Sequence, residues 1–88
     1  MADKIQLSIV TPDGTAFEKR VSYVNIPTGF GSVGILANHA PMLCAVKKGM
    51  LLCRTENGEE KRVFVGDGVA NTAENEVTLL VSDAREME

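Results

Sequence analysis

The sequence predicts an all-β protein, built as a small β-sandwich or flattened barrel of about eight to ten short strands. Apolar and polar residues alternate with a period of two along most of the chain, which is the pattern of half-buried strands. Turn-forming residues separate these stretches at short, regular intervals. No segment before Ser82 carries apolar residues at helical spacing over about ten positions, so a βαβ fold is excluded.

The expected strands share this alternation. In the first of them, Ile5, Leu7 and Ile9 fall on one face and the polar residues between them fall on the other. The expected strands are residues 5–10, 16–19, 21–26, 33–36, 42–46, 50–55, 61–65, 69–72 and 76–82.

Turn signals separate the expected strands. Residues 11–14 combine a proline with a final glycine and predict a turn. The pair Asn57-Gly58 is a strong hairpin signal between two of the strands. Residues 66–68 predict a tight turn or bulge, and Pro27 is expected to end the pairing of the strand before it.

The last residues differ from the rest of the chain. Residues 82–88 look like the beginning of a helix, with Asp83 as the N-cap and Glu86 as its partner in a capping box. The expected organisation is therefore one β-sandwich domain over residues 1–82, followed by a short tail at residues 83–88.

Composition and charge exclude several classes of protein. A net charge of −3 argues against a nucleic-acid binder, which would carry a clustered basic face. No stretch reaches the roughly 18 apolar residues of a membrane span, so direct membrane insertion is not expected. The strand pattern begins directly after Lys4, so a signal peptide is not expected.

The two cysteines suggest structural side chains rather than a reactive site. Cys44 and Cys53 fit a reducing compartment, and their spacing lacks the paired pattern of a zinc site. Cys44 with His39 would resemble a nucleophile and base, but no carboxylate is evident to orient the histidine. Small buried apolar side chains are the preferred interpretation, and no catalytic residue, metal or cofactor is expected.

Residues 29–43 are the most informative segment. They hold three of the eight glycines, one of the three prolines and the only histidine. Glycine lets the backbone approach another surface closely, and Pro41 fixes its own φ angle. We therefore expect this segment to be a contact surface rather than a simple connection.

Three motifs follow one another along the chain. They are Gly-x-x-Gly-Ile-Leu-x-x-His-Ala-Pro-Met-Leu at residues 31–43, Ala-Val-Lys-Lys-Gly-Met at residues 45–50, and Asn-Glu-Val-Thr-Leu-Leu-Val at residues 75–81. Each motif alone is weak. In this order, within a small β domain, they resemble the epsilon subunit of the F-type ATP synthase from about Ile5 to Ser82.

The resemblance implies a non-catalytic part of the rotor. Epsilon subunits link the gamma subunit to the c-ring at the foot of the central stalk, and support the coupling of ion translocation to ATP synthesis. A subunit of this kind lies peripherally, on the cytoplasmic, matrix or stromal face of an energy-coupling membrane.

The resemblance also implies two sets of contact residues. The residues expected to face the c-ring lie in the glycine- and histidine-bearing segment: Gly31, Ser32, Gly34, Asn38, His39, Ala40 and Pro41. The candidate set for the gamma subunit is outward and methionine-rich, namely Met42, Met50 and Leu51, and an edge of the sandwich is an equal alternative.

The sequence departs from the family pattern at several positions. Family members usually carry glutamate where this chain has Ser32, so the acidic side chain of the usual polar contact with the ring is missing. They usually have Pro-Gly at Ala37-Asn38, but asparagine can adopt the left-handed conformation that glycine supplies. The sequence ends before the family's inhibitory C-terminal helical hairpin, which implies assembly and coupling without inhibition.

Two other classes of protein compete with this resemblance. A biotinyl or lipoyl carrier domain is also a small all-β sandwich with a lysine near a turn, as Lys47 and Lys48 are here, but the flanking Met-Lys-Met or Asp-Lys pattern is missing. A small hydrolase would need a carboxylate to orient His39 and a Gly-x-Ser-x-Gly elbow, and the sequence has no such elbow.

Overall fold

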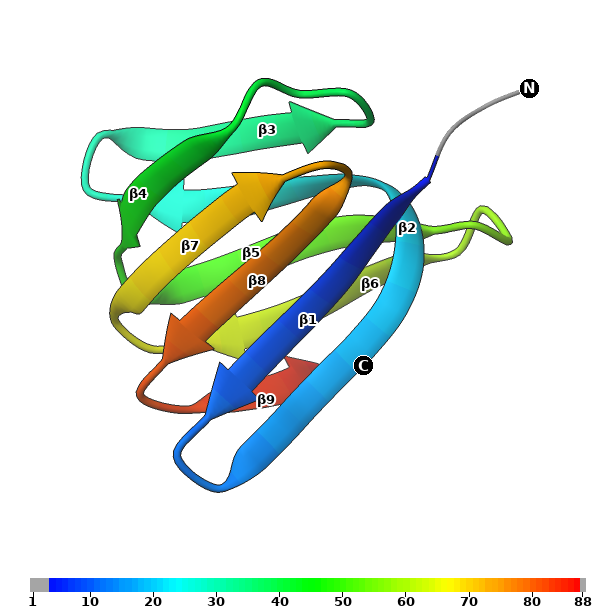
Figure 1. Cartoon of the computed structure of the whole chain (residues 1–88). Coiled ribbons are helices and arrows are strands. Elements are labelled where there is room, and N and C mark those ends of the chain that lie inside the picture. The colour runs from blue at the N-terminus through cyan, green and yellow to red at the C-terminus, as the bar shows by residue number, and fades with distance from the viewer. Residues whose placement is uncertain (1–3, 88) are drawn as a thin grey trace.

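The period-two pattern becomes nine β-strands in a computed structural model, which describes residues 4–87 (Figure 1). The prediction of an all-β fold is confirmed, and the described residues contain no helix. The strands are β1 (Ile5–Thr11), β2 (Gly14–Thr28), β3 (Gly31–Leu36), β4 (Met42–Val46), β5 (Gly49–Thr55), β6 (Glu60–Val65), β7 (Gly68–Ala73), β8 (Glu76–Val81) and β9 (Ala84–Met87).

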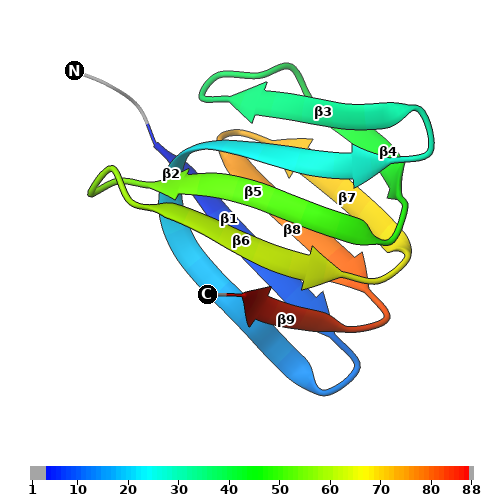
Figure 2. The same cartoon turned by 180° about the vertical axis from the view of Figure 1, so that it is seen from behind.

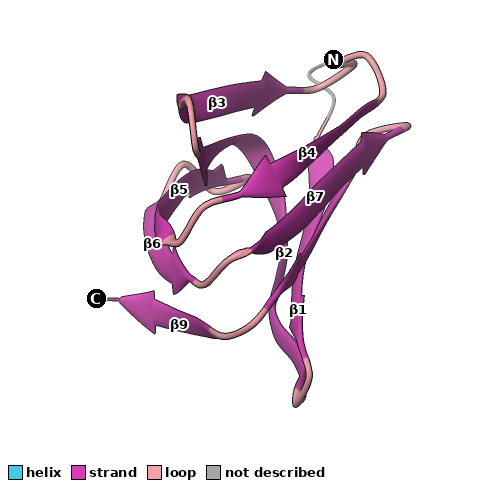
Figure 3. Ribbon diagram, turned by 90° about the vertical axis from the view of Figure 1, so that its left-hand side faces the viewer, coloured by secondary structure: helices cyan, strands magenta, loops and turns pink. Residues whose placement is uncertain are grey.

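The strands form one sheet that folds over on itself. Its order is β4-β7-β8-β1-β2-β5-β6-β9, and β3 pairs with β2 outside this path. Seen from the side, the sheet makes two facing layers (Figure 3). Because the order ends at β4 and β9, which do not pair with each other, the sheet is an open sandwich rather than a closed barrel.

The strand β2 belongs to both layers. Its first part pairs with β1, from Thr11↔Gly14 to Ile5↔Val21, and its second part pairs with β3 and β5. Sequence reasoning expected two strands here, ended by Pro27, but β2 is continuous over 15 residues and includes Pro27. Proline is tolerated because it lies beyond Asn25, the last residue paired with β5, and its carbonyl still accepts the Lys47 N–H at 3.1 Å.

The core lies between the two layers and follows the predicted alternation. On β1, Ile5, Leu7 and Ile9 are all buried, as their common face predicts. The buried apolar side chains are Ile5, Leu7, Ile9, Phe17, Val21, Val24, Ile26, Ile35, Val46, Leu51, Cys53, Val63, Val65, Ala70, Val77, Leu79 and Val81.

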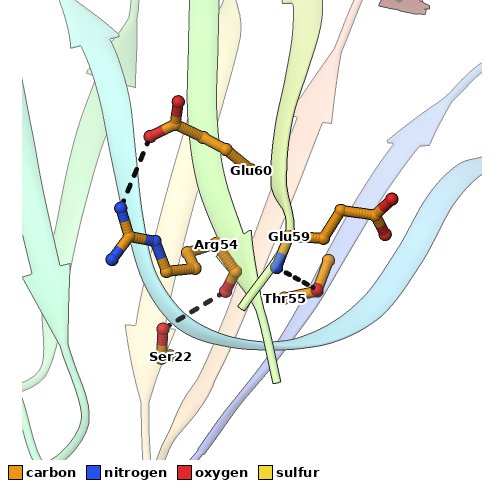
Figure 4. Close-up of polar contacts among 5 residues, drawn as sticks. All are labelled: Ser22, Arg54, Thr55, Glu59 and Glu60. Carbon is orange, nitrogen blue, oxygen red and sulfur yellow. Dashed lines mark hydrogen bonds and ion pairs between the residues drawn. The ribbon is translucent and has the colours of Figure 1, made fainter. Parts of the chain in front are cut away.

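The predicted β5–β6 hairpin forms around Asn57-Gly58, and Thr55 and Glu59 make a polar contact beside its turn (Figure 4). Gly58 has a φ of 84°, which glycine adopts without strain. The buried Thr55 accepts a hydrogen bond from the Glu59 N–H through its Oγ1 at 3.2 Å. Across the strands, Arg54 Nη2 lies 3.7 Å from Glu60 Oε2, an exposed ion pair of small energetic weight.

The expected helix start at the C-terminus is wrong for residues 84–87, which form β9 against the edge of β6 (Figure 2). The carbonyl of Asp83 accepts the Gly66 N–H at 2.8 Å, so this residue does not cap a helix. A helix of one turn is unstable alone, whereas the free edge of β6 offers a complete set of backbone partners. The Lys61 Nζ, 3.5 Å from Glu86 Oε2, adds an ion pair between the two strands.

The turn predicted at residues 66–68 lies very close to the backbone of residues 80–83. The Ser82 N–H donates to the Asp67 carbonyl at 3.0 Å. A Cβ atom at Gly68 would lie 1.9 Å from the Leu80 carbonyl oxygen, which is far inside contact distance. Glycine at this position is therefore a requirement for β7 to pair with β8.

We expect Gly68→Ala to destabilise the fold by about 2–4 kcal/mol, because the added methyl group must push β7 away from the backbone of β8. Gly29→Ala is the matched control, since a Cβ there would meet no atom within 4 Å. Urea unfolding followed by circular dichroism measures both. Equal stability of the two variants would contradict the requirement for glycine at position 68.

Candidate functional site

β3 forms one rim of the molecule together with the turn before it and the loop after it (Figure 1). We call residues 28–41 the β3 rim. Among the described strands β3 pairs only with β2, from Thr28↔Gly31 to Tyr23↔Leu36. Every residue that the family resemblance implies for the c-ring contact lies on this rim.

The β3 rim spreads these residues over its length. Gly31, Ser32 and Gly34 lie on β3 itself, whereas residues 38–41 lie in the loop that follows the strand. At about 3.3 Å per residue, the two ends of β3 lie about 17 Å apart. The residues therefore form an elongated edge rather than one compact pocket.

The loop after β3 has a defined shape. Asn38 has a φ of 67°, which confirms the left-handed conformation expected for it. The His39 N–H donates to the Leu36 carbonyl at 3.2 Å. The ring Nδ1 of His39 lies 2.7 Å from the Ala40 carbonyl oxygen, and because a carbonyl only accepts, Nδ1 carries the hydrogen in this contact. His39 thus holds the loop through a structural hydrogen bond.

Asn75 is a contact of the β3 rim that sequence reasoning missed. It lies in the β7–β8 turn with a φ of 60°, and its Oδ1 accepts the Asn38 N–H at 2.5 Å. Its Nδ2 donates to Asn38 Oδ1 at 3.2 Å. The two asparagines therefore tie the rim to the opposite layer. Only the turn at Asn75 was visible in the sequence, because the partner is 37 positions away.

The set predicted to face the gamma subunit does not form one surface. The inclusion of Leu51 is wrong, because its side chain is fully buried (0% exposed). Alternation along β5 turns Leu51 and Cys53 inward and leaves Met50 outward, at 39% exposed. Met42 is half-buried against the core on β4, a strand of the other layer.

Sequence reasoning missed a row of exposed apolar side chains on the layer formed by β4, β7, β8 and β1. Cross-strand pairing places Val10 of β1 beside Leu80 of β8, Leu80 beside Val69 of β7, and Val69 beside Ala45 of β4. Directly paired side chains share a face of the sheet. Leu80 is 53% exposed and Val69 is 43% exposed. We call these four residues the outer apolar row.

The two cysteines are buried or half-buried. Cys53 is fully buried, and burial raises the pKa of its thiol from 9.0 to about 11, with Glu86 adding to the effect and Lys61 opposing it. Cys44 is half-buried and packs against the core. The buried thiol of Cys53 is therefore in a poor environment for a nucleophile.

The remaining chemistry of the described residues is limited. Within residues 4–87 no group of three or more His, Cys, Asp or Glu side chains could hold a metal ion. No helix in the same range is long and apolar enough to cross a bilayer. Lys47 and Lys48 are exposed in the link between β4 and β5, where the Lys48 N–H donates to Asp67 Oδ1 at 2.8 Å.

We expect Asn75→Gly to loosen the β3 rim, because glycine keeps the positive φ but removes both hydrogen bonds to Asn38. The cost to stability is about 1 kcal/mol, and the Asn38 amide exchanges faster with solvent. Hydrogen exchange by NMR measures this. Glu74→Gly, in the same turn at a φ of 52°, is the control and leaves the Asn38 amide unchanged.

We expect folding stability to fall as the pH rises from about 9 to about 11, in part because of Cys53. In this range the thiol ionises in the unfolded chain but keeps its proton in the folded chain, so a contribution that is complete below pH 9.0 is progressively lost. Urea unfolding across this range shows a shallower decline for Cys53→Ala. An equal decline in Cys53→Ala and in the parent chain would contradict this prediction.

Comparison with known proteins matches the whole described chain to one family. Residues 4–87 match the model of the ATP synthase delta/epsilon chain β-sandwich domain. The chain is 36% identical over 84 residues to the chloroplastic ATP synthase epsilon chain of Oltmannsiellopsis viridis, covering 96% of this chain and 63% of that one. It is 38% identical over 88 residues to the ATP synthase epsilon chain of Nitratidesulfovibrio vulgaris strain DP4, covering 100% of this chain and 65% of that one.

Two solved structures share the fold. A chain of the Euglena gracilis mitochondrial ATP synthase (OSCP/F1/c-ring) superposes with a TM-score of 0.87 at 22% identity, over 94% of this chain and 53% of that one. A chain of the Tetrahymena thermophila mitochondrial ATP synthase (central stalk/c-ring) superposes with a TM-score of 0.73 at 21% identity, over 93% and 66%. This chain spans less than two thirds of the length of the curated relatives described above. Because its match covers the β-sandwich domain of the family, this chain belongs to the ATP synthase delta/epsilon chain family.

Proposed function

We propose that this chain is a non-catalytic component of the central stalk of an F-type ATP synthase, where it links the gamma subunit to the c-ring. The observation that carries the proposal is the family match over residues 4–87, together with relatives named as ATP synthase epsilon chains. A rotor component of this kind supports the coupling of ion translocation to ATP synthesis. The matches give no support to the carrier-domain alternative.

A non-enzymatic role fits the chemistry of the described residues. The histidine of the rim uses its Nδ1 on a backbone carbonyl, and the thiol of Cys53 is buried and protonated at neutral pH. Neither group is arranged as a nucleophile with its base. The chain would act through its surfaces, as a peripheral part of the complex on the cytoplasmic, matrix or stromal side of the membrane.

The gamma subunit is proposed to pack on the outer apolar row. Exposed apolar side chains in a continuous row are typical of protein interfaces, and Leu80 lies in the middle of this row. The c-ring is proposed to face the β3 rim, including Gly31, Ser32, Gly34 and residues 38–41. The two partners would thus bind different faces of one small body.

We expect the chain to form a one-to-one complex with a recombinant gamma subunit, and Leu80→Glu to weaken it about tenfold or more, because a charge would be buried at the centre of the row. Native mass spectrometry and gel filtration measure the complex. Met50→Glu is the matched control, because Met50 is also exposed but lies on the other layer.

Two results would contradict this proposal in different ways. No complex with the gamma subunit at micromolar concentration would contradict the stalk function itself. Loss of the complex in Met50→Glu and not in Leu80→Glu would contradict only the choice of face.

A further inference from the structure

The β5–β6 turn contains a pair of residues with a reactivity of its own. The chain has five asparagines, and Asn57 is the one that a glycine follows. Asparagine is chemically labile, because the backbone nitrogen of the next residue can attack its side-chain amide carbon. Glycine at the next position has no side chain to obstruct this attack. Asn57-Gly58 therefore has the sequence of a deamidation site.

The position of this pair leaves it open to water. Residues 56–60 are all exposed, and their turn projects beyond the body of the sheet (Figures 1 and 2). The other four asparagines are each followed by a residue with a side chain, namely Ile26, His39, Thr72 or Glu76. Exposure and an unhindered neighbour thus coincide at Asn57.

The folded turn keeps the attacking nitrogen occupied. The Gly58 N–H donates to the Thr55 carbonyl at 2.9 Å, which closes a β-turn over residues 55–58. The Thr55 N–H in turn donates to the Glu59 carbonyl at 2.8 Å. The Gly58 nitrogen must leave its hydrogen bond and lose its proton before it can attack Asn57. The two backbone hydrogen bonds of the turn therefore slow the reaction.

Few other contacts keep the turn closed. Its residues are exposed, so little apolar burial opposes its opening. The ion pair from Arg54 to Glu60 at 3.7 Å is exposed at both ends and contributes little. Exposed turns open locally at a small fraction of the free energy of global unfolding. Local opening of this turn would free the Gly58 nitrogen while the rest of the sheet stays folded.

We propose that Asn57 is a site of spontaneous deamidation to aspartate and isoaspartate, which the folded β5–β6 turn restrains and local opening of the turn releases. The inference is independent of the proposed function. In the first step the Gly58 nitrogen loses its proton and bonds to Asn57 Cγ, while the Cγ–Nδ2 bond breaks and ammonia leaves. Water then opens the resulting succinimide. Opening at Cγ gives aspartate, and opening at the main-chain carbonyl carbon gives isoaspartate.

Either product changes the hairpin. The new carboxylate joins Glu56, Glu59 and Glu60, so that the acidic side chains within residues 56–60 rise from three to four and repel one another. Isoaspartate also carries the main chain through its own methylene group, which lengthens the turn between the two closing hydrogen bonds. Its free α-carboxylate is the group that isoaspartyl carboxyl methyltransferases esterify, so the modified chain would be a substrate for that class of repair enzyme.

The test incubates the folded chain and a peptide of residues 54–60 side by side at mildly alkaline pH. Methyl transfer from labelled S-adenosylmethionine by an isoaspartyl methyltransferase measures isoaspartate, and peptide mass spectrometry locates it. Of the five asparagines, we expect Asn57 alone to react. The reaction is expected to be at least about fivefold slower in the folded chain than in the peptide, the factor that one net backbone hydrogen bond gives.

Asn57→Gln is the matched control, because the longer side chain would have to close a larger ring and the methylation signal should disappear. Circular dichroism checks that this variant is folded. Methylation that persists in Asn57→Gln, or isoaspartate found at another asparagine instead, overturns the inference. No isoaspartate in the folded chain, after several times the period that converts the peptide, also overturns it. Equal rates in the chain and the peptide overturn the restraint by the turn. All of these outcomes leave the proposed function standing, because binding to gamma is measured separately.

Discussion

The strand β2 is the constraint on which the rest of the structure depends. Its first part pairs with β1 in one layer, and its second part pairs with β3 and β5 in the other. The register shift between Val21 and Tyr23 lies where the strand passes from its pairing with β1 to its pairing with β5. Without this shared strand, the two layers would be joined only by short turns and by the packing of their side chains.

The position of the β3 rim follows directly from β2. β3 pairs with no other described strand, so its register on β2 sets where Phe30, Ser32 and the loop after β3 lie. Two pairs of residues then fasten the ends of the rim: Asn38 with Asn75 at one end, and Pro27, directly before the rim, with Lys47 at the other. The glycines in this segment therefore shape the rim, while contacts with distant residues keep it in place.

Local patterns in the sequence predicted most of the fold, because a half-buried strand repeats every two residues wherever it occurs. Properties that depend on distant residues were not predictable in this way. The alternation around β9 carried no signal, because residues 84–87 are a strand only through the free edge of β6. The inward direction of Leu51 was available from the alternation with Cys53, and the error came from grouping it with Met50 by residue type.

In the candidate surfaces, too, local properties were predictable and contacts between distant residues were not. The conformation of Asn38 could be predicted, since it depends on what asparagine itself can adopt, but its partner Asn75 could not. The outer apolar row likewise consists of one residue from each of four strands, so no stretch of sequence displays it. The two proposed contact faces are nevertheless joined without a break, because β3, β2, β1 and β8 are successive hydrogen-bonded neighbours. A force applied at the rim would reach Leu80 across three strand pairings and no flexible linker, which is the mechanical property that a small rotor component needs.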